Sequence, residues 1–191
     1  DQKPILYPDS DVPIVEPENI GDADTLGEKE QRTLEIVRAA IQNGERALIY
    51  TSWVRTDSQQ KLKRFLTDEG YRTEILTDKI KTTDREDWVQ KKLAAGMQVL
   101  IVNPSLVETG LDLNAFTTLV FYSMGYKLFT LRQASRRSWR INQKAPAVKV
   151  YMLYYEDTMQ QKCLKLMASK LAVAGLIEGN FSEEGLAAMS D

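Results

Sequence analysis

The sequence contains no histidine and a single cysteine, Cys163, among its 191 residues. The lack of histidine excludes Ser-His-Asp and Cys-His catalysis and histidine-bound zinc. One cysteine cannot form an internal disulfide or a cysteine metal cluster, so we expect no metal-binding residues. We expect Cys163 to pack as a small apolar residue in a reducing cytoplasm. Any chemistry must therefore use arginine, lysine, carboxylates, hydroxyls and backbone groups.

Several further features are missing. No run of about 18 apolar residues is present, which excludes a membrane-spanning helix. No Gly-x-x-x-x-Gly-Lys-Ser/Thr loop is present to hold phosphates, and no Asp-Glu pair follows a buried strand where it could hold magnesium. The chain does not begin with Met, and its first residues lack a signal pattern, so we expect a fragment of a longer protein.

The length and the content of 43% hydrophobic and 27% charged residues suit one soluble globular domain. The net charge of -2 conceals an uneven distribution. Residues 1–30 carry nine acidic and two basic residues, whereas residues 127–149 carry seven basic residues and no acidic one. A solvated helix face normally mixes both signs, so the basic stretch indicates an anionic partner such as phosphate.

Apolar runs and glycines predict an α/β fold with an open, mainly parallel sheet covered by helices on both faces. Short apolar or β-rich runs predict strands at 47–51, 71–76, 99–102, 117–122 and 147–155. Helical spacing predicts helices between them, including one over 128–138, with stops at Asn43-Gly44, Gly70 and Gly96. A last helix carries an apolar stripe of Met159, Cys163, Met167 and Leu171, which we expect to pack in the core.

The same patterns divide the chain into three parts. Four of the six prolines fall within the first 17 residues, so residues 1–27 are expected to form an extended acidic arm or linker. Residues 28–175 form the predicted domain, and residues 176–191 form an acidic tail.

The most informative segment is RQASRRSWRINQ at 132–143. Gln133, Arg137 and Arg140 lie at offsets of zero, four and seven, so a helix would present all three on one face. Guanidinium groups stay charged and offer a fork of donors to phosphate oxygens, which suits stabilisation of phosphoryl transfer. On the charges alone, a basic helix face that makes surface salt bridges is the better explanation.

This segment resembles motif VI of superfamily-two helicases, in which a Gln is followed by Arg four and seven residues later. The ending Arg140-Ile141-Asn142-Gln143 is similar to the Arg-Ile-Gly-Gln of the Swi/Snf-like branch. The sequence departs from that branch at three positions, where it has Arg136 for Asp, Trp139 for His and Asn142 for Gly. The resemblance is closest to helicase-like proteins of bacteria, phages and mobile elements.

Two upstream segments follow the same family order. VLIVNPSLVETGLDL at 99–113 resembles motif V, a loop that faces nucleotide and nucleic acid. The resemblance assigns Gly110 and Asp112 to the nucleotide, and Asn103 and Ser105 to nucleic acid. GERALIYTSWVRTD at 44–57 resembles motif IV, in which Thr51 and Ser52 would donate to a nucleic-acid phosphate. Capping of the next turn explains these two hydroxyls equally well.

The resemblance covers about residues 28–175 and implies the second, C-terminal RecA-like lobe of an ATP-dependent DNA helicase or translocase. In this family ATP with Mg²⁺ binds between two lobes and is held mainly by the first. Arg137 and Arg140 would then reach across as arginine fingers, with Gln133 beside them. The implied partners are the first RecA-like lobe and DNA, with double-stranded DNA favoured by the Swi/Snf-like ending. The isolated lobe is expected to be inactive.

Two other interpretations remain open. A non-catalytic RecA-like module for protein docking would suit the acidic arm and tail but would leave the basic segment 127–149 unexplained. An unrelated doubly wound transferase is less favoured, because glycine-rich phosphate loops and histidine are absent.

Overall fold

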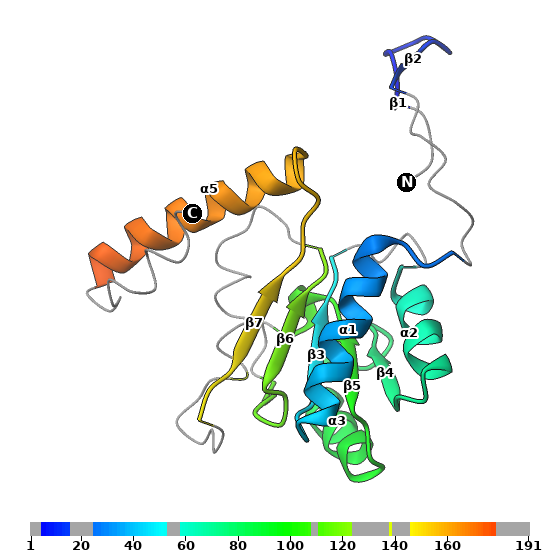
Figure 1. Ribbon diagram of the computed structural model, residues 1–191, viewed down its shortest axis with the longest axis vertical. Helices are drawn as coiled ribbons and strands as arrows, with labels where there is room; N and C mark the ends of the chain where they lie inside the picture. The colour runs from blue at the N-terminus through cyan, green and yellow to red at the C-terminus, as the bar shows by residue number, and fades with distance from the viewer. Residues whose placement is uncertain are drawn as a thin grey trace.

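The computed structural model describes residues 5–15, 25–52, 58–107, 111–123, 138 and 146–178. Its main feature is a five-stranded, all-parallel sheet with the strand order β4-β5-β3-β6-β7 (Figure 1). The strands are β3 (Ala47–Tyr50), β4 (Thr73–Leu76), β5 (Val99–Val102), β6 (Thr118–Phe121) and β7 (Lys149–Met152). The predicted open parallel sheet is confirmed.

Helices connect and cover the strands. They are α1 (Glu28–Gln42), α2 (Ser58–Asp68), α3 (Arg85–Ala94) and α5 (Met159–Glu178), with short 3₁₀ helices η1 (Thr82–Asp84) and η2 (Pro104–Val107). Gly44, Gly70 and Gly96 follow the first three α-helices with φ values of 73°, 86° and 88°. These left-handed conformations favour glycine and explain why the helices end there. The helix predicted over 128–138 lies outside the described residues, apart from Ser138.

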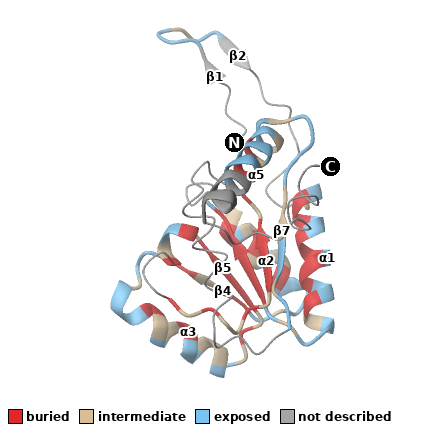
Figure 2. Ribbon diagram, turned by 90° about the vertical axis from the view of Figure 1, so that its left-hand side faces the viewer, coloured by how far each residue is buried: buried red, intermediate tan, exposed pale blue. Residues whose placement is uncertain are grey.

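The core consists of two apolar layers, one on each face of the sheet. Leu48, Tyr50 and other alternate strand residues pack on one face with Val89 of α3 and with Cys163 and Met167 of α5. Ala47, Ile49 and their neighbours pack on the other face against α1 and α2. Figure 2 shows the buried strands between these layers. Burial on both faces explains why the strands are continuous apolar runs without a polar alternation.

The strand order places a topological switch point between β3 and β6. The chain leaves β3 toward β4 on one side of the sheet, and it leaves β6 toward β7 on the other. Ligand sites of open α/β sheets form at such points, beyond the carboxyl ends of the strands. The carboxyl edge near β3 and β6 is therefore where a functional site is expected.

Some elements differ from the sequence-based expectation. The N-terminal arm contains a two-stranded antiparallel hairpin, β1 (Ile5–Leu6) and β2 (Pro13–Val15). The stripe on α5 is only partly core: Cys163 and Met167 are buried, but Met159, the first residue of the helix, is 64% exposed. The Leu171 side chain lies outside the described part of the chain. Burial raises the pKa of the Cys163 thiol, as suits a packing residue. No helix in the described ranges is long and apolar enough to cross a membrane.

Replacing a central strand side chain tests the two-layer core. Leu48 is fully buried in β3, so Leu48→Ala should lower the free energy of unfolding by about 2–5 kcal/mol through lost burial and a residual cavity. Val150, on the edge strand β7, is 43% exposed, and Val150→Ala serves as the control with a much smaller loss. Urea denaturation monitored by circular dichroism measures both values, and equal losses would contradict the assigned core.

Candidate functional site

Three hydroxyl-bearing residues connect the carboxyl ends of β3 and β6. The Ser52 backbone N–H donates to Ser123 Oγ at 2.7 Å, and Ser123 Oγ donates to Thr51 Oγ1 at 3.3 Å. Thr51 and Ser123 are buried, whereas Ser52 is exposed. The first two residues after β3 are thus held against the end of β6, with the Ser52 side chain at the surface.

The loop after β5 is ordered by a polar turn. Asn103 Oδ1 accepts hydrogen bonds from the Ser105 backbone N–H at 3.0 Å and from Ser105 Oγ at 2.8 Å. Ser105 is exposed and Asn103 is half-buried. Because β5 is the neighbour of β3, this turn and Ser52 both follow central strands at the carboxyl edge. Asn103, Ser105 and Ser52 are therefore brought to the same edge of the sheet.

The Gly-Leu-Asp-Leu segment is anchored by its leucines. Leu111 and Leu113 are buried in the core layer that also contains Val89 and Met167. Asp112 between them is half-buried, and its carboxylate accepts hydrogen bonds from the Asn114 backbone N–H at 3.0 Å and from Asn114 Nδ2 at 3.2 Å. The leucines fix the backbone of the loop, and Asp112 stiffens the turn that follows it.

A buried lysine joins three elements at this edge. Lys29 in the first turn of α1 is 7% exposed. Its Nζ donates to the Tyr122 carbonyl at 2.8 Å, directly after β6, and to Gln160 Oε1 of α5 at 2.7 Å. Nζ also lies 5.3 Å from the centroid of the Tyr122 ring and 5.2 Å from that of Tyr155. Burial lowers the pKa of Lys29 from 10.5 to about 8, despite the nearby charge of Glu30.

Glu30 extends this cluster to α2. Its Oε1 accepts a hydrogen bond from the Tyr122 hydroxyl at 2.7 Å and lies 3.5 Å from Lys61 Nζ. Burial, together with the hydrogen bond to Glu30, raises the pKa of Tyr122 above its ordinary value, so Tyr122 stays a neutral donor. The first turn of α1 is therefore tied to α2, to the end of β6 and to the start of α5.

The structure places only part of the predicted site. Five of the predicted residues lie on loops that follow β3 or β5, namely Thr51, Ser52, Asn103, Ser105 and Asp112. The other predicted residues lie outside the described ranges, namely Gly110, Gln133, Arg137 and Arg140. Their assigned roles stay predictions. Across the described ranges, no group of three or more His, Cys, Asp or Glu side chains could hold a metal ion.

Two residues of this edge were not singled out from the sequence. Ser123 directly follows the residues predicted as a strand at 117–122, so the rule that polar residues at strand ends form sites could have found it. Lys29 gave no such signal, because its partner Tyr122 lies 93 positions away in the chain.

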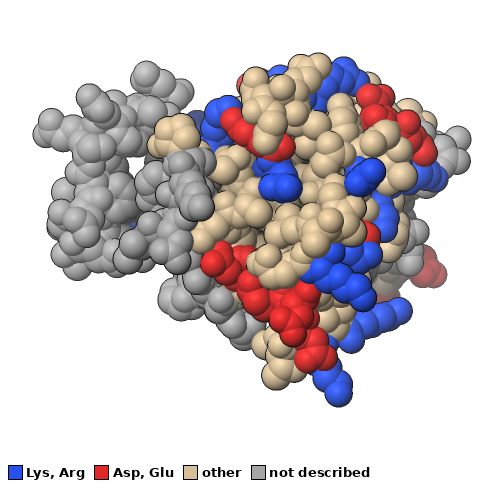
Figure 3. Space-filling view, turned by 90° about the horizontal axis from the view of Figure 1, so that it is seen from below, with Lys and Arg blue, Asp and Glu red and all other residues tan. Residues whose placement is uncertain are grey.

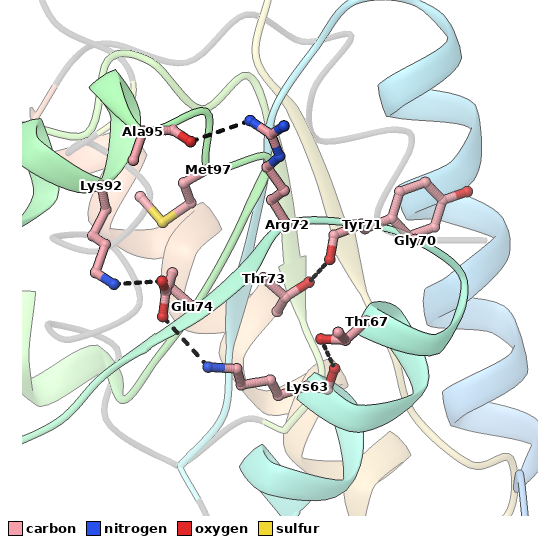
Figure 4. Close-up of a pocket in the computed structure, with 10 residues that line it drawn as sticks. All are labelled: Lys63, Thr67, Gly70, Tyr71, Arg72, Thr73, Glu74, Lys92, Ala95 and Met97. Carbon is pink, nitrogen blue, oxygen red and sulfur yellow. Dashed lines mark hydrogen bonds and ion pairs between the residues drawn. The ribbon is translucent and has the colours of Figure 1, made fainter.

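A cavity of about 370 Å³ lies at the opposite end of the sheet, between the start of β4 and the C-terminal ends of α2 and α3 (Figure 4). Glu74 lies between Lys92 and Lys63, with its Oε2 3.4 Å from Lys63 Nζ. Partial burial opposes ionisation of Glu74, but the two lysines hold its pKa below the ordinary value. Figure 3 shows the molecule from below the view of Figure 1, and both acidic and basic side chains are visible on this face.

Comparison with known proteins decides the family. The family described as "Helicase conserved C-terminal domain" matches residues 28–142, which is more than half of the chain. The chain belongs to this family. The matched range includes the loops after β3, β5 and β6 and the basic segment as far as Asn142.

Relatives of this helicase C-terminal domain come from a bacterium and a yeast. A Mycoplasma pneumoniae protein named as an uncharacterized ATP-dependent helicase is 23% identical over 143 residues, covering 74% of this chain and 14% of that protein. The ATP-dependent helicase fft3 of Schizosaccharomyces pombe is 22% identical over 154 residues, covering 80% and 16%. The match thus spans only 14% to 16% of the length of these relatives. A bacterial, phage or mobile-element origin stays a prediction.

A solved structure shares the fold. The C-terminal part of the Fun30 ATPase domain superposes with a TM-score of 0.65 at 18% identity, covering 73% of this chain and 44% of that one. This similarity confirms the RecA-like arrangement of the helicase C-terminal domain.

Titration of Lys29 should be visible in the stability of the domain. Between pH 8 and 10 the unfolded chain keeps the Lys29 proton and the folded chain releases it, so folding becomes more favourable as the pH rises. The free energy of unfolding of the native chain, minus that of Lys29→Met, should therefore rise by about 2 kcal/mol over this range.

Urea denaturation at several pH values measures this difference. Tyr122 is present in both proteins, so its titration cancels. Lys91 is exposed on α3, and Lys91→Met, compared with the native chain in the same way, controls for the loss of a lysine at the surface. A flat difference for Lys29→Met would show that the ammonium is not desolvated as described.

Proposed function

We propose that this chain is the C-terminal RecA-like lobe of an ATP-driven DNA helicase or translocase of superfamily two, in its Swi/Snf-like branch. The observation that carries the proposal is the position, in the chain, of the connection that contains the basic segment 127–149. The connection from β6 to β7 leaves the carboxyl edge at Ser123, beside the switch point, and contains Gln133, Arg137 and Arg140. The segment that resembles motif VI thus lies on the connection that starts at the edge where ligands of open α/β sheets bind.

The chemistry of these residues suits a nucleoside triphosphate. Arg137 and Arg140 are permanently charged donors that match phosphate oxygens, and Gln133 adds an amide one turn away on a helix. We assign the two arginines to stabilising the charge that develops on the terminal phosphate during hydrolysis. Gly110 and Asp112, on the loop after β5, would contribute to the same nucleotide cleft. ATP supplies the free energy of the motor, and a first RecA-like lobe holds most of it together with Mg²⁺.

The nucleic-acid track is assigned to the loops after β3 and β5. Ser52 is an exposed hydroxyl that can donate to a phosphate oxygen without reading bases. Ser105 is also exposed, and on binding its hydroxyl would exchange the hydrogen bond to Asn103 Oδ1 for one to a phosphate oxygen. Asn103 fixes the turn that carries Ser105. Thr51 is fully buried and accepts a hydrogen bond from Ser123, so we assign it to supporting the position of Ser52. Double-stranded DNA is the favoured track because of the Arg-Ile-x-Gln ending at 140–143.

Closure of the two lobes around ATP would bring the arginines to the phosphates, and reopening after hydrolysis would move the loops along DNA. Substituting the arginines in the two-lobe protein tests this mechanism. Arg137→Ala and Arg140→Ala should each lower DNA-stimulated ATP turnover roughly 10³-fold while leaving ATP binding nearly unchanged, because arginine fingers act on the transition state.

Lys144→Ala is the matched control, because it removes a cation from the same basic segment outside the Gln-Arg-Arg pattern. Steady-state phosphate release and equilibrium binding of a fluorescent ATP analogue are the measurements. Unchanged turnover in both arginine variants would reject the assigned mechanism.

The isolated chain provides a second test. Without a first lobe it should show negligible ATPase activity but weak binding to double-stranded DNA. Raising the salt concentration from 50 to 200 mM should weaken that binding roughly 10-fold or more, because phosphate contacts release counterions. Fluorescence anisotropy of a labelled duplex measures this. A complete lack of DNA binding at 50 mM salt would favour the alternative of a protein-docking module.

A further inference from the structure

Two consecutive residues at the start of α3 hold both flanks of the loop that follows β5. Arg85 Nη1 donates to the Leu106 carbonyl at 3.0 Å. Glu86 Oε2 accepts a hydrogen bond from the Asp112 backbone N–H at 2.8 Å. Leu106 and Asp112 lie on either side of residues 108–110, which are outside the described ranges. The first turn of α3 therefore makes hydrogen bonds to the backbone at two positions, Leu106 and Asp112.

Arg85 is an unusual residue for this role because it is only 8% exposed. Its Nε donates to the Ile80 carbonyl at 3.2 Å, so the guanidinium connects the chain before α3 to η2. A buried guanidinium stays charged, and its desolvation is tolerated only with good hydrogen bonds. Carbonyl partners from two separate loops meet that need and fix the distance between those loops.

Glu86 is itself held in place. Its Oε1 accepts a hydrogen bond from Gln90 Nε2 at 3.1 Å, one turn further along α3. The two carboxylate oxygens thus serve different partners, one on the helix and one on the loop. The helix behind them is firmly seated, since Val89 is fully buried and Lys92 pairs with Glu74 of β4. The hydrogen bond from the Asp112 N–H therefore ends on α3, a helix that is packed in the core.

We propose that Arg85 and Glu86 are positioning residues that set the place of the Asp112 loop at the carboxyl edge. This inference rests on the proposed function, in which that loop contacts nucleotide and nucleic acid. Neither residue belongs to the three segments that resemble helicase motifs. Their effect on ATP turnover would pass through the loop, because the bonds that they make are to its backbone.

The test compares Glu86→Ala with Asp87→Ala in the two-lobe protein. Both substitutions remove one negative charge from the first turn of α3, but Asp87 is exposed and only Glu86 accepts from the Asp112 N–H. Glu86→Ala should lower kcat for DNA-stimulated hydrolysis roughly 10- to 100-fold through misplacement of the loop. Asp87→Ala should stay close to the native value. Glu86→Gln keeps an acceptor oxygen and should recover most of the loss.

Amide hydrogen exchange on the 191-residue chain gives a readout that is independent of catalysis. Exchange at the Asp112 N–H should become roughly 10-fold faster in Glu86→Ala than in Asp87→Ala, because its acceptor is gone. Equal exchange in the two variants, or equal kcat, would overturn the inference. The proposed function is judged separately by Arg140→Ala: if that variant stays fully active, the function is wrong, whereas the exchange result still reports on the grip of α3.

Discussion

Burial of both faces of a parallel sheet is the constraint on which the rest of this structure depends. Side chains such as Leu48 and Ile49 point to opposite faces, and both must be covered. Parallel strands also require long crossovers, and α2 and α3 return the chain over the faces of the sheet between β3, β4 and β5. The loops that follow the strands consequently all emerge at a single edge. The residues available for chemistry gather there because of how the core is covered.

The same edge is secured by side chains that bind backbone groups. Lys29 donates to the Tyr122 carbonyl, Arg85 to the Leu106 carbonyl, and Ser123 accepts from the Ser52 N–H. Each contact joins a loop to another part of the chain. Buried polar groups are costly unless they are paired, so such contacts favour one arrangement of the loops over others. These side chains thus preorganise the edge where ligands are expected, and they can do so without contacting a ligand.

Much of the fold could be predicted from the sequence because its signals are local. The run VLIV at 99–102 and the glycines after three helices mark elements without knowledge of the rest of the chain. Long-range features could not be found in this way. The Lys29–Tyr122 contact spans 93 positions, and the helical spacing of Met159 with Cys163 and Met167 did not reveal that Met159 is exposed. For the site, Ser52 and Ser105 were assigned through a resemblance, as Arg137 and Arg140 were, and the general rule that sites form beyond strand ends agrees with the first two.

The register of the sheet has a consequence for variation in this domain. All five strands are four residues long and end in mutual register, at Leu76, Val102, Tyr50, Phe121 and Met152. An insertion of one residue within a strand would raise its loop by about 3.3 Å above its neighbours and turn every later side chain to the other face. Length changes should thus be tolerated in the helices and loops of homologous sequences but not between the paired strand residues.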